Sequence, residues 1–375
     1  MKPIKADYRC MKAILLSLIV VCSFSRSLWG AGGTVIVYSP WSGIGCVTNV
    51  PIGLSNAVAV AAGLDDAQAL LNDGTVVAWG IGDYGQTNVP AGLSNVVAIS
   101  SGWAFNMALK AEGTVVTWGF PIGEISGMPA GLSNVVAIAA GGQQFCLALR
   151  ADTTVVAWGC NGSGQTDVPI GLTNVISIAA GLDHSLALRN DGTVIAWGGG
   201  NYGETNVPAN LSNVVAIAAG WSQSFALRAD GTCVGWGMDA TNIPFNLSNV
   251  VAIAGGWDAG QEILFSNGTL LWDGWAGWSN VMAIARGHFF TVAIVGPNGP
   301  GIDCNEPVAH QSWMNGCFEG SVATRNGRVY TLQYKNLLTD GQWIAMPLAG
   351  GNGQIQWLKD NNASSPQRFY RVLRW

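Results

Sequence analysis

The fold of this chain is decided by one stretch, Leu188-Arg189-Asn190-Asp191-Gly192-Thr193-Val194-Ile195-Ala196-Trp197-Gly198, and by its variants elsewhere in the sequence. The threonine of this phrase recurs seven times, with steps of 37 to 41 residues, at Thr34, Thr75, Thr114, Thr154, Thr193, Thr232 and Thr269. A repeat of this size is one supersecondary unit that cannot bury its own apolar faces, so neighbouring units have to cover them.

A second phrase, Val214-Val215-Ala216-Ile217-Ala218-Ala219-Gly220, follows the first and is apolar on both alternating faces. This pattern is typical of a strand that is covered on both sides. Two more strands follow it, Phe225 to Arg228 and Thr232 to Trp236, joined by the turn Ala229-Asp230-Gly231. Sheets of three or four strands that repeat at this spacing predict a β-propeller, and seven copies predict seven blades.

The two ends of the array are complementary. It opens with the outer strand of a blade, Thr34 to Tyr38, and closes with the two inner strands of one, Val281 to Ile294. We therefore expect residues 33–41 to pair with the strand that ends near Ile294 and to close the ring without a free edge. Six tryptophans share one repeat position, which predicts core between blades; they are Trp79, Trp118, Trp158, Trp197, Trp236 and Trp272.

Outside the propeller, at residues 33–295, we expect a signal peptide at 1–31, a linker at 296–304 and a small β-sandwich-like module at 305–375. The signal is indicated by basic residues before an uncharged run, Ala13 to Phe24, which is too short to span a bilayer. Export permits disulfides, and Cys304 with Cys317 is the best candidate pair, whereas the other four cysteines of the mature chain are expected to be buried thiols.

The charge balance excludes nucleic acid as a partner. The 33–295 array has five basic residues against sixteen acids, and removal of residues 1–31 moves the formal net charge from -5 to about -9. Such a surface repels phosphate backbones.

The repeated phrase Ala-Leu-Arg-x-Asp-Gly-Thr-Val-x-x-Trp-Gly, followed by Val-Val-Ala-Ile-Ala-Ala-Gly, resembles the repeat of the regulator of chromosome condensation family. The resemblance covers residues 33–295 and implies a seven-bladed propeller, but no particular activity, since members of this family differ in function. The short units are most similar to those of secreted bacterial beta-lactamase inhibitor propellers. The C-terminal phrases Tyr330-Thr331-Leu332-Gln333-Tyr334 and Arg368-Phe369-Tyr370-Arg371-Val372 resemble a small β-module of exported bacterial proteins.

The sequence shows no catalytic motif, and we expect neither an enzyme nor a cofactor or metal. Asp183, His184 and Ser185 look like a triad in a row, but neighbours on a strand point to opposite faces, so His184 is interpreted as structural. Asp65 and Asp66 are interpreted as solvated loop carboxylates rather than as a cation site.

The sequence predicts a binding face more readily than a catalytic site. The loop after Ala-Gly and the loop after Trp-Gly should share one rim of the propeller, and aromatic and acidic side chains gather in both. The predicted partner-binding residues are Tyr84, Trp103, Phe105, Tyr202, Trp221, Trp257, Asp258, His288 and Phe289. Tryptophan and tyrosine are enriched in protein-binding hot spots. We expect a secreted, periplasmic or cell-surface monomer that binds a protein partner there; the alternatives are a carbohydrate-binding propeller, with a glycan as the ligand, and an inhibitor of an extracellular enzyme.

Overall fold

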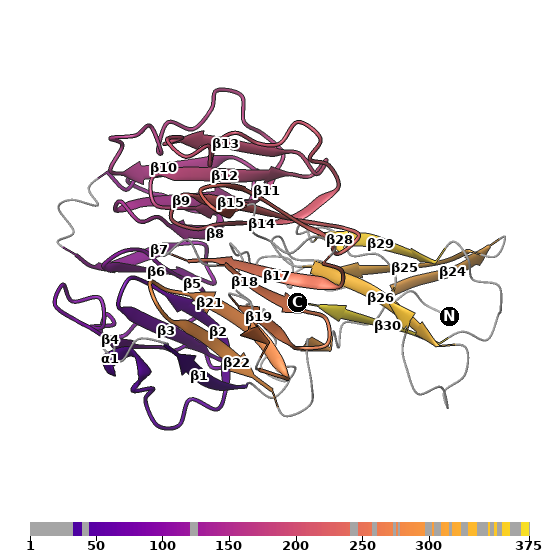
Figure 1. Cartoon of the computed structure of the whole chain (residues 1–375), viewed down its shortest axis with the longest axis horizontal. Helices are drawn as coiled ribbons and strands as arrows, with labels where there is room; N and C mark the ends of the chain where they lie inside the picture. The colour runs from indigo at the N-terminus through magenta and orange to yellow at the C-terminus, as the bar shows by residue number, and fades with distance from the viewer. Residues whose placement is uncertain are drawn as a thin grey trace.

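A computed structural model describes residues 33–39, 45–120, 127–240, 247–256, 261–272, 275–276, 278–296, 302–303, 309–314, 317–323, 329–335, 344–345, 349–350, 355–360 and 369–374. These residues form an almost entirely β structure, with one short helix, α1 (Gly45–Thr48). Figure 1 shows the sheets of the repeats gathered in one body and the C-terminal strands beside it.

The repeats build seven antiparallel sheets, the blades of a propeller. Five blades have an inner, a middle and an outer strand in chain order: β2 (Ala57–Ala62), β3 (Asp66–Leu71) and β4 (Val76–Gly80); β5 (Val96–Ser101), β6 (Phe105–Lys110) and β7 (Val115–Gly119); β8 (Val135–Ala140), β9 (Phe145–Arg150) and β10 (Val155–Gly159); β11 (Val175–Ala180), β12 (His184–Arg189) and β13 (Val194–Gly198); β14 (Val214–Ala219), β15 (Gln223–Arg228) and β16 (Cys233–Gly237). The next blade has four strands, β17 (Val250–Gly255), β18 (Gln261–Phe265), β19 (Leu270–Trp272) and β20 (Trp275–Ala276).

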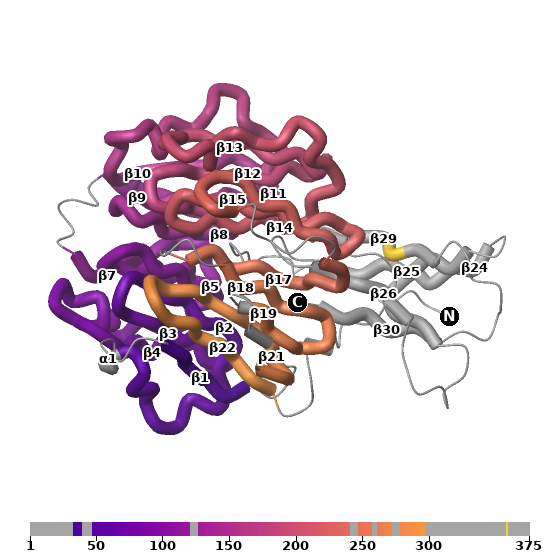
Figure 2. Tube along the Cα trace, in the orientation of Figure 1, coloured from indigo at the N-terminus to yellow at the C-terminus, as the bar shows by residue number. Residues whose placement is uncertain are grey.

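The seventh blade closes the ring. It is composed of β21 (Val281–Arg286), β22 (Thr291–Val295) and, from the other end of the array, β1 (Thr34–Tyr38). The antiparallel register runs from Thr34 opposite Val295 to Tyr38 opposite Thr291. Figure 2 shows the indigo β1 beside the orange β22. The predicted closure is thus confirmed for residues 34–38.

The core lies between the blades. All six residues of the inner strand β2 are buried, as the apolar pattern on both of its faces predicts. The repeated tryptophan is also buried, with 4% to 7% of its surface exposed, at Trp79, Trp118, Trp158, Trp197 and Trp236. The interpretation of this position as core is therefore confirmed in five blades, while the Trp272 side chain lies outside the described residues.

The Asp-Gly-Thr phrase forms the hairpin turn between the middle and outer strands of three blades, beginning at Asp73, Asp191 and Asp230. Oδ1 of Asp191 accepts hydrogen bonds from the backbone N–H of Thr193, at 2.9 Å, and from its hydroxyl, at 2.6 Å. Gly192 between them has a φ of 80°, in the left-handed region that glycine tolerates best. The turn chemistry explains why these three residue types recur together.

The C-terminal strands form two sheets. One contains β23 (Ile302–Asp303), β30 (Phe369–Arg374), β26 (Val329–Lys335), β27 (Ile344–Ala345) and β28 (Ala349–Gly350); the other contains β24 (Ala309–Met314), β25 (Cys317–Ala323) and β29 (Ile355–Asp360). Because β23 pairs with β30, sheet structure begins inside the stretch predicted as a linker.

Candidate partner-binding face

One end of the propeller is a ring of short loops, each joining an inner strand to its middle strand. Backbone hydrogen bonds connect loops of neighbouring blades: Leu64 N–H donates to Trp103 O at 3.3 Å, Leu182 N–H to Trp221 O at 3.1 Å, and Trp221 N–H to Gly256 O at 2.8 Å. The chain after each outer strand lies at the same end, because Ile81 N–H donates to Asp65 O at 2.9 Å. The prediction that both kinds of loop share one rim is therefore confirmed. We call this end the loop face.

Glycine opens each of these loops because a side chain would have no room. A Cβ on Gly181 would lie 2.2 Å from Cε1 of His184 and 2.7 Å from the carbonyl oxygen of Gly220 in the next blade. A Cβ on Gly102 would lie 2.2 Å from Cε1 of Phe105. Real Cβ contacts are not this short, so glycine lets the His184 and Phe105 rings pack beneath these two loops, and at Gly181 it also lets the neighbouring backbone approach.

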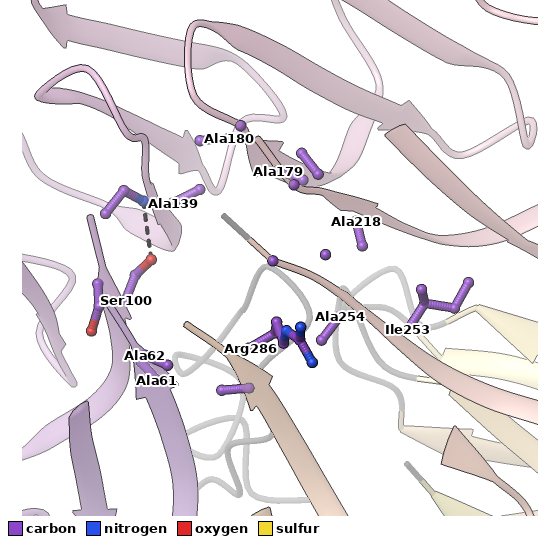
Figure 3. A pocket seen from close by; sticks show the side chains of 18 of the residues that line it. Ala61, Ala62, Ser100, Ala139, Ala179, Ala180, Ala218, Ile253, Ala254 and Arg286 are labelled. Carbon is purple, nitrogen blue, oxygen red and sulfur yellow. Dashed lines mark hydrogen bonds between the residues drawn. The ribbon is translucent and has the colours of Figure 1, made fainter. Parts of the chain in front are cut away.

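The axis of the ring contains a small cavity of about 110 Å³, lined by inner strands of all seven blades. Alanine is the commonest residue of its wall, and Figure 3 shows Arg286 as the large polar side chain among the labelled residues. Arg286 Nη1 lies 2.8 Å from Oε1 of Glu262, and both side chains are buried. The hydroxyl of Thr291 donates to the same carboxylate oxygen. A compensated ion pair therefore occupies this part of the axis.

Four of the predicted binding residues are exposed on the loop face. The exposed fractions are 43% for Trp103, 39% for Trp221, 53% for Tyr84 and 55% for Tyr202. Large aromatic side chains exposed together on one face are the usual composition of a protein-binding hot spot.

The structure brings three of the predicted residues together. The ring centroids of Trp221 and His288 are 6.3 Å apart, and those of His288 and Phe289 are 3.7 Å apart. His288 and Phe289 are half-buried. Since Trp221 precedes β15 and His288 precedes β22, this contact joins loops from two different blades.

One predicted site residue is wrong. Phe105 is fully buried, because it begins the middle strand β6 and its ring lies beneath Gly102. The same strand position carries Phe145 and Phe290, which are also buried. Phe105 therefore belongs to the core and cannot contact a partner.

Three further predicted residues remain untested. Trp257 and Asp258 lie outside the described residues, as does Cys304 of the predicted disulfide. Cys317 begins β25, and its side chain is not described. Cys146, Cys160 and Cys233 are free thiols; Cys146 is buried as expected, whereas Cys160 and Cys233 are half-buried. The side chain of Cys46, the fourth of these cysteines, is not described.

Sequence reasoning missed two residues of this face, Phe120 and Met238. The ring of Tyr84 lies against that of Phe120, with centroids 5.1 Å apart, and Met238 is exposed. Both follow a Trp-Gly pair directly, so the signal that would have found them is the variable position after that pair.

The acidic residues of the face also differ from expectation. Asp66 is buried rather than solvated, and its Oδ2 accepts a 2.9 Å hydrogen bond from the Asn106 amide. Burial raises the pKa of Asp66 to about 7, although the hydrogen bond from Asn106 opposes the shift. Burial likewise raises the pKa of Asp65, with the nearby His288 opposing this shift.

Among the described residues, no helix is long and apolar enough to cross a membrane.

The fold and the ring of loops define a seven-bladed β-propeller. The family model of the Regulator of chromosome condensation (RCC1) repeat matches residues 135–165 and 175–204. Two of the seven repeats, those of the β8–β10 and β11–β13 blades, thus match the RCC1 repeat, in agreement with the resemblance drawn from the repeated phrases.

Solved structures agree on the fold. Prp20p from Saccharomyces cerevisiae is 17% identical, with a TM-score of 0.59, over 74% of this chain and 94% of that one. Human WBSCR16 is 18% identical, with a TM-score of 0.53, over 63% and 86%. The ectodomain of the Physcomitrella patens receptor kinase CR4 is 23% identical, with a TM-score of 0.53, over 68% and 75%. No curated protein matches the chain.

Proposed function

We propose that this chain is an exported, non-catalytic propeller that binds a protein partner through its loop face. The observation that carries the proposal is the exposure of Trp103, Trp221, Tyr84 and Tyr202 at that end, on loops from different blades. Aromatic side chains supply large contact areas at low conformational cost, and they dominate protein interfaces. A partner that covers several blades would bury more than one of them.

The compared structures support a protein as the class of partner, but they do not identify the partner of this chain. Prp20p binds Gsp1p and histones, and a further solved structure contains Kap60 bound to yeast RCC1 (Prp20). At 17% identity these partners are not carried over to this chain. The acidic array argues separately against a nucleic acid ligand, since binding a phosphate backbone needs basic side chains.

Export rests on the N-terminal sequence pattern, a basic segment followed by an uncharged run, which is typical of a signal peptide. We propose a secreted, periplasmic or cell-surface location on this basis. Alkaline phosphatase fused after residue 39 in a bacterial host would be active outside the cytoplasm if residues 1–31 direct export. Activity that is unchanged when residues 1–31 are removed would contradict it.

The binding proposal is tested by affinity capture from the envelope and medium of the producing organism. The purified chain is compared with a Trp103→Ala/Trp221→Ala variant, in which both exposed indoles are lost. Truncation of a hot-spot residue typically costs 2 kcal/mol or more, about thirty-fold in affinity, so the double variant should lose the captured protein. Its thermal melting curve should stay close to that of the parent chain, because both side chains are exposed.

The matched control is Arg189→Ala/Arg228→Ala, two cationic residues beside the hairpin turns at the opposite end. This variant should capture the partner as the parent chain does. Loss of capture with the arginine pair, and not with the tryptophan pair, would place the binding face at the other end. A glycan array probed with the same proteins tests the carbohydrate alternative, which the exposed Tyr84 beside the exposed Asp83 favours.

A further inference from the structure

Three side chains that can bind a metal meet where the β11–β13 blade adjoins the β14–β16 blade. They are Asp183, His184 and Glu204, all buried, and one ligand atom from each lies within 4.8 Å of the others. Asp183 and His184 stand at the start of β12, whereas Glu204 lies in the loop from β13 to β14. That loop rests on the next blade, because Glu204 O accepts a 2.8 Å hydrogen bond from Trp236 Nε1.

The two carboxylates lack a cationic side chain. In the described part of the chain neither Asp183 nor Glu204 forms a salt bridge. Their side-chain hydrogen bonds come from neutral donors: the backbone N–H of Tyr202 lies 2.8 Å from Glu204 Oε2, and the hydroxyl of Ser163 lies 3.3 Å from Asp183 Oδ2. Two buried carboxylates at this separation repel each other, so proteins neutralise such a pair with a proton, a basic side chain or a metal ion.

The imidazole of His184 offers the third ligand in the right protonation state. The Ser224 hydroxyl donates to Glu204 O at 2.8 Å, so its single proton is used there, and at 3.0 Å it can only accept from His184 Nε2. Nε2 therefore carries the ring proton and Nδ1 has the free lone pair. Nδ1 is buried and has no hydrogen-bond partner in the described structure.

Among the blades whose equivalent residues are described, only the β11–β13 blade carries this combination of ligand side chains. Four blades have all the equivalent residues described, and the ring-closing blade carries three apolar residues there, Phe289, Phe290 and Val47. The other three differ from one another. The β2–β4 blade carries Asp65, Asp66 and Gln86, the β8–β10 blade carries Gln144, Phe145 and Gln165, and the β11–β13 blade carries Asp183, His184 and Glu204. In the first, an amide of the next blade donates to one oxygen of the buried acid, since Asn106 Nδ2 donates to Asp66 Oδ2. The β11–β13 blade combines an imidazole with two carboxylates. At the position that corresponds to Asn106, the blade next to it carries Ser224.

We propose that Asp183, His184 and Glu204 bind one divalent transition-metal cation of the Zn²⁺ class and thereby fasten one blade to the next. One imidazole nitrogen with two carboxylate oxygens suits Zn²⁺ and its neighbours, whereas Ca²⁺ takes six to eight oxygen ligands. The cation would neutralise both buried carboxylates and take one imidazole nitrogen of His184 as its third ligand. This site revises the expectation that the chain binds no metal, and it is independent of the proposed partner.

The experiment uses the purified chain, treated with a chelator and exchanged into chelator-free buffer. Calorimetric titration with ZnCl₂ should show one Zn²⁺ per chain, and Zn²⁺ should raise the melting temperature, since a ligand that binds only the folded state stabilises it. Two variants, His184→Phe and Glu204→Gln, install the residues that sister blades hold at these positions. Each should weaken Zn²⁺ binding at least roughly ten-fold, the loss seen when even an outer-shell partner is removed, and abolish the Zn²⁺-dependent rise in melting temperature.

Two controls distinguish this site from adventitious binding. His288→Ala removes the other described histidine of the loop face, and Cys160→Ser removes a half-buried thiol; both should bind Zn²⁺ as the parent chain does. The proposal is overturned if the parent chain binds no Zn²⁺, or if His184→Phe and Glu204→Gln both bind it with unchanged affinity. Should His184→Phe fail to fold, Glu204→Gln, which keeps the shape of the side chain, decides the question alone.

Discussion

The indole Nε1 of Trp197 donates a 2.9 Å hydrogen bond to the backbone carbonyl of Gln165, 32 residues earlier in the chain. Gln165 lies in the loop that enters the blade from its predecessor, so the bond anchors this loop to the outer strand of the following blade. The same spacing recurs between Trp118 and Gln86 at 2.9 Å, and between Trp236 and Glu204 at 2.8 Å. The repeated tryptophan therefore fills the core and also fixes the loop that leads into its own blade.

From this relationship we expect Trp197→Ala to cost roughly 3 to 5 kcal/mol of unfolding free energy, as truncation of a large core aromatic does. Trp197→Phe keeps a ring but removes one of the two donors to the Gln165 carbonyl, because the Ser185 hydroxyl also donates to it at 2.8 Å, and it should cost about 1 kcal/mol. Trp221→Ala on the loop face should cost under about 1 kcal/mol. Urea denaturation of the three variants measures these differences. Equal losses for Trp197→Ala and Trp221→Ala would contradict the assignment of one tryptophan to the core and the other to the surface.

Ring closure gives the second prediction. Deletion of residues 33–39 removes β1, exposes the edge of β22 and uncovers the apolar side chains that Val35 packs against. The melting temperature should fall markedly, and the open β22 edge should promote association between chains. Differential scanning calorimetry with size-exclusion chromatography checks both effects. A melting curve unchanged by the deletion would mean that the β1–β22 pairing contributes little to the stability of the ring.

The third prediction concerns pH. Asp66 has a pKa of about 7 in the folded protein and 3.8 as the ordinary value, so between pH 4 and 7 the folded state holds a proton that the unfolded state releases. The stabilisation that the protonated Asp66 carboxyl gives the folded state is therefore complete below pH 4 and is lost as the pH rises through 7, at about 1.4 kcal/mol per pKa unit. Asp66→Asn should keep the contact with Asn106, remove this loss, and melt at a higher temperature than the parent chain at pH 8.

Asp73 provides a control of opposite sign. Hydrogen bonds from the Thr75 side chain and backbone lower the pKa of Asp73, so its contribution is present at neutral pH and is lost on acidification. Asp73→Asn should therefore lower stability slightly at pH 7 and leave the difference between pH 7 and 8 unchanged. Melting temperatures measured from pH 4 to 8 distinguish the two behaviours. An Asp66→Asn variant that is less stable than the parent chain at pH 8 would show that the carboxylate is held in its charged form.

The architecture could be predicted from sequence because each local signal occurs many times over. Thr193 and its six equivalents gave the blade count, and the incomplete blades at the two ends gave the closure that places Thr34 opposite Val295. The shared rim followed from strand direction alone. The error at Phe105 has a physical origin: only Ala104 separates it from Trp103, and the point at which β6 begins decides which ring is buried.

The meeting of Asp183, His184 and Glu204 could not be predicted in the same way. Twenty residues separate Glu204 from His184, and their contact depends on how the loop after β13 folds over the next blade. The neighbours of His184 in the sequence do not reveal its hydrogen-bond partner, because the hydroxyl that reaches His184 belongs to Ser224 of the next blade rather than to Ser185. A repeat pattern fixes positions that are alike in every blade, whereas this cluster arises from positions where one blade departs from the others.

The last prediction tests the ring of glycines around the axis. A Cβ added to Gly102 would lie within 2.2 to 2.8 Å of three atoms of the buried Phe105 ring, which has no room to move away. Gly102→Ala should therefore cost about 1 to 3 kcal/mol, as overpacking of a core does. Gly162 is the matched control, because it has nothing within 4 Å and no positive φ, so Gly162→Ala should be neutral or stabilise the chain slightly. Urea denaturation of both variants measures the contrast. If the two alanines have equal effects, the inner loops are more adaptable than the packing of Gly102 on Phe105 implies.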